Sequence, residues 1–375
     1  ASWRLIFAVN VVPVLITLWL LSRLEGDHRD PGHIDFVGAV LCAIGLGGPV
    51  FALIEQPAYG WGDARVSIPL IAGLVLFAAF VVWEWRSPHP MMPLKLFASR
   101  NFAIGNLTTF TMYAGLNVAI FFVILFVQQV GGYKPIVAGL ALLPVTLLMF
   151  LLSRRFAALA DRIGPHYFMG FGPIIAGLGL LLLVRTDARA HYVSAILPGI
   201  LVFGIGLSAT VAPLTATVLG SVQAGHSGVA SGVNNAIARV AGLLAIAALG
   251  AIVASSFSSR LDHNLAGHRL SPRAAAVVAS DRTRALVVSV NRVPVSERSQ
   301  VHAALVNASV YAFRIGLGIG AGLVVLGGIV ALIGIENPRR TVPCAECPGG
   351  ALQGATVDVA RRAPDRGPVA AESPA

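Results

Sequence analysis

Acidic side chains are missing from every long apolar stretch of this sequence. The chain has 375 residues, of which 56% are hydrophobic and only 12% are charged. So low a charged fraction argues against a water-soluble globular fold. Nine stretches are long and apolar enough to cross a bilayer, and none contains an Asp or a Glu. They are residues 5–22, 36–54, 66–83, 102–129, 136–153, 167–184, 193–219, 228–257 and 312–335.

The stretches also lack the alternation of apolar and polar residues that a membrane β-barrel requires. Each reaches the roughly 17 to 25 residues that a helix needs to cross about 30 Å of hydrocarbon. Because backbone amides cannot stay unpaired in lipid, apolar runs of this length should be helical. We therefore predict an all-α integral membrane protein with nine transmembrane helices.

Lysine is scarce, since Lys95 and Lys134 are the only two, and the net charge of +10 comes almost wholly from arginine. Most of the arginines lie in connectors and tails, not on a soluble basic face, which argues against a nucleic-acid partner. Alternate connectors hold eight Lys and Arg residues on one side and four on the other, with the long segment 258–311 left out. The positive-inside rule then places the first set and the C-terminus in the cytoplasm.

Only three cysteines are present. Cys42 lies inside an apolar stretch and is most simply a small buried residue. Cys344 and Cys347 form one CxxC with no second pair and no nearby His, which is weak evidence for zinc, and its role stays open. The surrounding residues 337–375 are rich in Pro, Gly, Ala and Arg without periodicity, and we predict that this tail is disordered.

Residues 258–311 are polar and Arg-rich, yet they contain apolar clusters at 274–279 and 286–290. Short amphipathic helices on the outer face and a plain solvated loop are both compatible with this pattern.

One connector carries a specific motif, RRFAALADRIGP at residues 154–165. A short turn with an Asp beside arginines can pair with neighbouring helix ends in one conformation and release them in another, and a glycine permits the tight reversal. The segment resembles the cytoplasmic signature loop of the major facilitator superfamily, with Asp161, Arg162 and Gly164 at matching positions. Ala157 stands where that pattern often has Gly, and His166 where it often has Arg or Lys. The alternative is an ordinary basic turn.

Four other segments narrow the resemblance. SWRLIF with the following NVVP (residues 2–13) and IDFVGA (34–39) are similar to the sixth and seventh helices of the 14-helix drug:proton antiporter family. APLTAT (212–217) and the run from GVASGVNN to Arg239 (228–239) resemble its twelfth and thirteenth helices. The resemblance covers residues 1 to about 336. It implies a fragment truncated at its N-terminus that starts at the sixth helix.

The resemblance also implies a division of the chain. Residues 1–24 would be the last helix of the N-terminal bundle and 25–101 two linking transmembrane helices. Residues 102–336 would be the complete C-terminal six-helix bundle, with 258–311 as an extracellular loop. Residues 337–375 would be the disordered cytoplasmic tail. In that architecture the fourth, fifth, seventh and eighth stretches face a central cavity.

Polar side chains form a stripe on two of those stretches. Those of the fourth fall within about 100 degrees of one another at 3.6 residues per turn, and those of the eighth do the same. Hydrogen bonding between packed helices is the alternative to a cavity. The candidate cavity-lining residues are Asn106, Thr109, Tyr113, Asn117, Gln128, Asn234, Asn235 and Arg239.

Arg239 lies about three turns into its stretch, where a cation costs at least about 2.5 to 3.5 kcal/mol unless it is paired or hydrated. Its partner would be backbone, water or an acid in the absent bundle. A structural role near the cytoplasmic end is the alternative to substrate contact. Gly316, Gly318, Gly320 and Gly322 in the last stretch predict close helix packing rather than a dinucleotide loop.

The resemblance implies a proton-coupled secondary transporter that exports drugs or other amphiphilic small molecules, with no cofactor beyond the proton gradient. The Arg-rich composition is typical of GC-rich bacteria, so we expect a multi-pass protein of the bacterial inner membrane. Its partners would be substrate, protons, the lipid bilayer and the missing N-terminal bundle, which should hold the proton-exchanging acids. The alternative is a non-transporting membrane partner or a membrane enzyme, but the histidines are scattered over several connectors and form no paired site.

Overall fold

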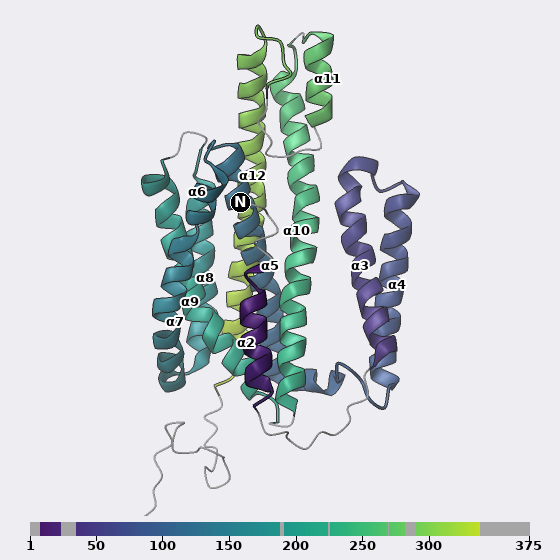
Figure 1. Cartoon of the computed structure of the whole chain (residues 1–375), viewed down its shortest axis with the longest axis vertical. Coiled ribbons are helices and arrows are strands. Elements are labelled where there is room, and N and C mark those ends of the chain that lie inside the picture. Colours follow the sequence, from purple (N-terminus) through teal and green to yellow (C-terminus); the bar gives the residue numbers. More distant parts are fainter. Residues whose placement is uncertain are drawn as a thin grey trace, which may run out of the picture. The chain divides into compact units, whose positions relative to one another are not determined.

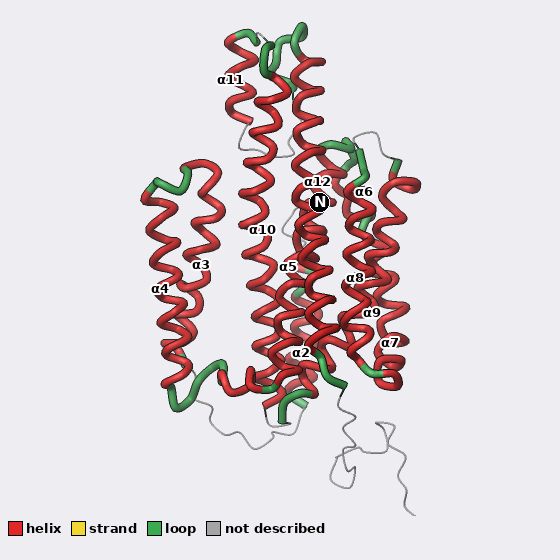
Figure 2. The backbone as a smooth tube through the Cα atoms, turned by 180° about the vertical axis from the view of Figure 1, so that it is seen from behind, coloured by secondary structure: helices red, strands yellow, loops and turns green. Residues whose placement is uncertain are grey.

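The computed structural model describes residues 8–23, 35–187, 191–223, 226–268, 270–281 and 290–337, and these ranges contain helices and loops but no strand (Figure 2). Eight helical stretches within them are long and apolar enough to cross a membrane (Figure 1). The chain is therefore a multi-pass membrane protein. The stretches are α3 (Phe36–Tyr59), α4 (Ala64–Arg86), α5 (Arg100–Gln129), α6 with α7 (Pro135–Leu140 and Leu143–Ile163), α8 (Pro165–Val184), η2 with α9 (Tyr192–Ile196 and Leu197–Gly220), α10 (Ser227–Leu265) and α12 (Arg298–Gly334).

The predicted count of nine spans is not confirmed. The first predicted stretch, 5–22, corresponds to α2 (Val11–Leu21), which has 11 residues and is shorter than a span. Residues 1–7 lie outside the described ranges.

The helices also run past the predicted ends, and α3 includes Glu55 while α4 includes Glu84. Acids are thus absent from the apolar windows but not from the helices. Backbone hydrogen bonding continues beyond the apolar run that hydropathy detects.

Two helices are much longer than a bilayer requires. At 1.5 Å per residue, the 39 residues of α10 and the 37 of α12 span about 58 and 55 Å, against about 30 Å of hydrocarbon. Figure 1 shows both projecting past their neighbours beside α11 (Pro272–Asp281). We call α11 and the adjoining ends of α10 and α12 the helical cap.

The helical cap replaces the plain loop considered for residues 258–311. Leu261, Ala274 and Leu305 are buried in it and continue the hydrophobic core of the membrane helices. The Glu297 carboxylate accepts hydrogen bonds from the backbone N–H of Ser271 at 2.9 Å and from its hydroxyl at 2.7 Å. The predicted short helix at 274–279 therefore exists, whereas most of the second apolar cluster, 286–290, lies outside the described residues.

The helices α5 to α12 pack through α8–α9, α8–α12, α5–α12 and α5–α10 contacts. Glycine sets the closest approaches. A Cβ placed on Gly328 would lie 2.5 Å from the carbonyl oxygen of Gly170, and one on Gly316 would lie 2.7 Å from Val253. Close packing is thus confirmed at Gly316, and Gly320 is also tight at 3.2 Å from Val118. At Gly318 and Gly322 nothing lies within 4 Å, because these two face away from the contact.

α3 and α4 form a hairpin that packs against α10 through α3. Asp35 caps α3 by accepting a hydrogen bond from the Gly38 N–H at 2.7 Å, and it also accepts one from Trp83 Nε1 at 3.0 Å. The buried Glu84 accepts a bond from the Met92 N–H at 2.8 Å. The last bond ties the end of α4 to the connector that leads to α5.

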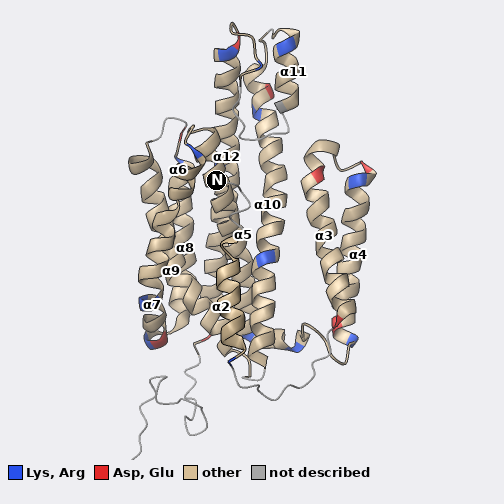
Figure 3. Cartoon of the chain, viewed as in Figure 1, with Lys and Arg blue, Asp and Glu red and all other residues tan. Residues whose placement is uncertain are grey.

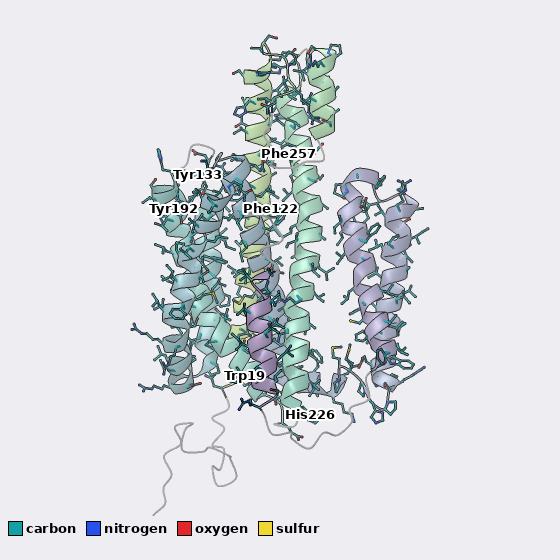
Figure 4. The ribbon with its side chains drawn as sticks, in the orientation of Figure 1. Trp19, Phe122, Tyr133, Tyr192, His226 and Phe257 are labelled. Atoms are coloured by element: carbon teal, nitrogen blue, oxygen red, sulfur yellow. The ribbon has the colours of Figure 1, made fainter. Side chains whose placement is uncertain are left out.

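Aromatic residues mark one end of the helices. Figure 4 shows Tyr133 and Tyr192 at the end opposite His226. The Tyr192 hydroxyl donates a hydrogen bond to the Ala141 carbonyl at 2.8 Å, which joins the start of η2 to the break between α6 and α7. Tyrosine with an apolar ring and a bonded hydroxyl is typical of a membrane–water interface.

Candidate functional site

A cleft of about 430 Å³ lies between α5, α9 and α10. Its wall combines hydroxyl and amide groups with aliphatic side chains, and it holds one cation. The lining residues are Tyr113, Leu116, Asn117, Thr215, Leu219, Ser231, Asn234, Asn235, Ala238, Arg239, Gly242, Leu243 and Ile246.

Gly242 lets α5 and α10 approach each other at the cleft. A Cβ on Gly242 would lie 2.6 Å from Nδ2 of Asn117, so any larger residue would displace that amide. Asn117 Nδ2 in turn donates a hydrogen bond to the Tyr113 carbonyl at 2.8 Å. The Asn117 side chain is therefore held against its own helix by a bond and against α10 by packing.

The amide of Asn234 is supported from behind by α5. The fully buried Thr109 hydroxyl lies 2.9 Å from the Gly105 carbonyl oxygen and 2.9 Å from Asn234 Oδ1. A hydroxyl carries one proton, so it donates to one of these oxygens at a time. The neighbouring Asn235 donates to the Ser231 carbonyl at 3.0 Å. The polar wall of α10 is thus partly ordered before any ligand binds.

The structure brings five of the eight candidate cavity residues to the cleft. These five are Tyr113, Asn117, Asn234, Asn235 and Arg239. Asn106 and Thr109 lie on the same stripe of α5 but are buried between helices, and Gln128 is outside the cleft lining.

The polar stripe on α5 therefore extends beyond the cleft, and its N-terminal part is buried between packed helices. Asn106 Nδ2 donates to the Phe102 carbonyl at 2.9 Å, a bond within its own helix. Thr215, from α9, joins the cleft although periodicity did not single it out. It follows Pro213 within the APLTAT segment, and the family resemblance of that segment was the feature of the sequence that could have pointed to it.

Arg239 is the one Lys or Arg in the cleft lining. It lies about 18 Å from Ser227 along the helix axis at 1.5 Å per residue. Its side chain has no hydrogen-bond or ion-pair partner among the residues that the structure describes.

The signature loop is more helical than predicted. α7 continues through residues 154–163, and the reversal occurs at Gly164, whose φ of 111° is a conformation that favours glycine. Glycine's predicted role in the turn is confirmed. Asp161 and Arg162 are exposed, and neither side chain is paired within the described ranges. His166 Nε2 lies 2.6 Å from the Leu332 carbonyl oxygen, which ties α8 to α12.

A second cavity, about 490 Å³, lies between the α3–α4 hairpin and α5 with α10. It is almost wholly apolar and includes Phe77, Phe80, Phe97 and Phe110. Cys42, predicted to be a buried residue, is half-buried and lines this cavity. Sequence periodicity gave no signal for it, because its walls come from elements far apart in the chain.

The described part of the chain holds no group of three or more His, Cys, Asp or Glu residues placed to bind a metal. Cys344 and Cys347 lie outside the described residues, as does the predicted disordered tail from residue 338 onward.

Comparison of the sequence with known proteins places this chain in a family. Residues 1–246 match the family model described as Major Facilitator Superfamily. The multidrug resistance protein Stp of Mycobacterium tuberculosis is 31% identical over 271 residues, which are 70% of this chain and 49% of that protein. The tetracenomycin C resistance and export protein of Streptomyces glaucescens is 28% identical over 264 residues, 68% of this chain and 48% of that protein.

A third relative, the drug efflux pump JefA of M. tuberculosis, is 26% identical over 359 residues, 90% of this chain and 68% of that protein. The chain spans about half the length of the first two relatives. These findings confirm the resemblance seen in the signature loop and set aside the membrane-enzyme alternative. The chain belongs to the Major Facilitator Superfamily.

Proposed function

We propose that this chain supplies one wall of the substrate pathway in a proton-coupled secondary transporter that exports drugs or other amphiphilic small molecules. The observation that carries the proposal is the polar cleft between α5, α9 and α10, set in helices that are otherwise apolar. The names of its relatives, which include multidrug resistance and antibiotic export proteins, support it.

The composition of the cleft suits amphiphiles. Amide and hydroxyl groups both donate and accept hydrogen bonds, so Asn234, Asn235 and Thr215 can meet many polar groups. Leu116 and Leu243 provide apolar surface for the rest of the ligand. A few placed polar groups in an apolar wall are the usual composition of a small-molecule site.

The proposed architecture follows the family resemblance. α2 would end the first bundle, α3 and α4 would link the bundles, and α5 to α12 would form the second. The second wall of the cleft and the acids that exchange protons would come from the first bundle. The cleft lining from α5, α9 and α10 carries no Asp or Glu, so this wall does not itself supply a proton-exchanging acid.

The proposed orientation has the Gly164 end in the cytoplasm and the helical cap outside a bacterial inner membrane. Blue segments lie at the Gly164 end of the helices (Figure 3). Arg86 ends α4, Lys95 lies between α4 and α5, and Arg154 and Arg155 lie in the C-terminal half of α7. The positive-inside rule favours that assignment. Asp161 and Arg162, exposed at the same end, are then placed to pair with the other bundle and to release it when the transporter changes conformation.

Efflux of an amphiphilic dye from cells that express the whole reading frame tests the proposal. We expect efflux that an uncoupler abolishes and that Asn117→Leu, inside the cleft, strongly reduces at equal membrane abundance. Gln128→Leu is the matched control, because it makes the same kind of change on α5 outside the cleft. Efflux that continues unchanged in the presence of the uncoupler would contradict the proposal. An equal loss of efflux in both variants would also contradict it.

A further inference from the structure

We infer that the cleft selects amphiphiles that carry an acidic group, and that Arg239 binds that group. The inference rests on the proposed function and names its substrate class. The cleft lining contains one guanidinium and no Asp or Glu, so its formal charge is positive.

The amides of the cleft are partly occupied. The Asn117 and Asn235 amides donate to carbonyl oxygens of their own helices, and Asn234 lies against the Thr109 hydroxyl. The Arg239 side chain has no hydrogen-bond or ion-pair partner within the described residues. Its five N–H donors are therefore the largest unused hydrogen-bonding capacity in the cleft.

The neighbouring helices offer no carboxylate to pair with Arg239. α5 and α9 contain no Asp or Glu at all. The acid on α10 is Asp262, about 35 Å away along the axis at 1.5 Å per residue. The buried Glu84 of α4 lies against α3, since its Oε1 would lie 2.9 Å from a Cβ on Gly38, and its Oε2 accepts a hydrogen bond from the Met92 N–H. The described helices around the cleft therefore give Arg239 no counter-charge, and a ligand with an acidic group would supply one.

The surroundings of Arg239 define the ligand further. Leu243 and Ile246 follow it on α10, and Leu116 and Leu219 face them from α5 and α9. A guanidinium binds carboxylate, sulfonate or phosphate oxygens through two parallel hydrogen bonds. The fitting ligand is therefore an amphiphile with an oxyanion beside an apolar body, and a lipophilic cation would meet repulsion.

Three fluorescent ligands with the same apolar body distinguish these cases: pyrenebutyrate, the neutral pyrenebutanol and the cationic pyrenebutylamine. Binding is measured on the purified whole chain in detergent micelles, with empty micelles subtracted. We expect pyrenebutyrate to bind most tightly and pyrenebutylamine most weakly. Arg239→Gln should weaken pyrenebutyrate binding about 10- to 100-fold, the range for a charged hydrogen-bonded contact. It should leave pyrenebutanol binding nearly unchanged.

Arg260→Gln is the matched control, because it removes one positive charge from the same helix outside the cleft, where Arg260 lies over the Tyr311 ring. Arg239→Lys should restore part of the preference, since it keeps the charge without the paired geometry. Equal binding of the anionic and cationic ligands by the unmodified chain would overturn the inference without any variant. Equal effects of Arg239→Gln and Arg260→Gln would also overturn it.

Failure of the inference is distinguishable from failure of the proposed function. Proton-dependent dye efflux with no preference for the anion would leave the transporter proposal standing and refute the role of Arg239. A clear anion preference without any proton-dependent efflux would support the role of Arg239 and refute the transporter proposal.

Discussion

Glycine has a different effect at the α8–α12 contact and at the α5–α10 contact. Along α8 and α12 the contact is closed, and a Cβ on Gly328 would lie 2.5 Å from the Gly170 carbonyl oxygen. Along α5 and α10 one glycine, Gly242, admits the Asn117 side chain, and the helices then separate around a cleft.

The difference shows what decides whether two membrane helices enclose space. Between helices in lipid there is no hydrophobic driving force, so contact depends on packing and on hydrogen bonds. Small residues on both partners, as on α8 and α12, bring the backbones together. Along α5 and α10, the larger side chains Tyr113, Asn117 and Arg239 line a cleft instead.

The largest effect is expected from Gly328→Leu, which breaks the closed contact. The added side chain meets backbone that cannot move aside, so we expect the free energy of unfolding to fall by about 1 to 3 kcal/mol or more. Thermal unfolding in detergent, followed by fluorescence-detected size exclusion, measures the change. Gly322→Leu, on the same helix with nothing within 4 Å of the added Cβ, should have little effect. Equal destabilisation by both would contradict the assignment of the closed contact to Gly328, because Leu favours a helix more than Gly does.

Gly242→Leu should separate binding from stability. The new side chain displaces Asn117 and fills the cleft, so we expect pyrenebutyrate binding to weaken more than tenfold. Its effect on thermal unfolding should be smaller than that of Gly328→Leu, because the cleft can take up the added volume. Gly250→Leu is the control on the same helix, where an added Cβ meets nothing within 4 Å. Unchanged binding in Gly242→Leu would refute the assignment of the cleft.

The smallest effect is expected from Thr109→Val, which keeps the shape of the side chain and removes the hydroxyl behind Asn234. We expect pyrenebutyrate affinity to fall a few-fold, in line with about 0.5 to 1.5 kcal/mol for one hydrogen bond. Thr108→Val is the matched control, since Thr108 is also buried on α5 but its hydroxyl lies 3.5 Å from the Gly327 carbonyl on α12. A larger effect on ligand binding from Thr108→Val would contradict the division of α5 into two faces.

Much of the fold was predictable because hydropathy is a local property. Runs of apolar residues located the eight membrane-spanning stretches, and a glycine in the signature loop predicted the reversal at Gly164. Helix ends were not predictable in this way. The projecting parts of α10 and α12 are polar on their outer faces, so no apolar run marks them. Glu84 was missed because its bond to Met92 depends on how the connector folds back.

The sequence by itself determined that this is a helical membrane protein, because the cost of unpaired backbone in lipid leaves long apolar runs one solution. It also determined which face of α5 and of α10 is polar. Only the tertiary structure decided where that polarity is buried and where it meets space. Asn106 and Tyr113 share a stripe, yet one is enclosed by helices and the other lines the cleft. A cleft is the volume that three helices fail to fill, and that depends on side chains from all three at once.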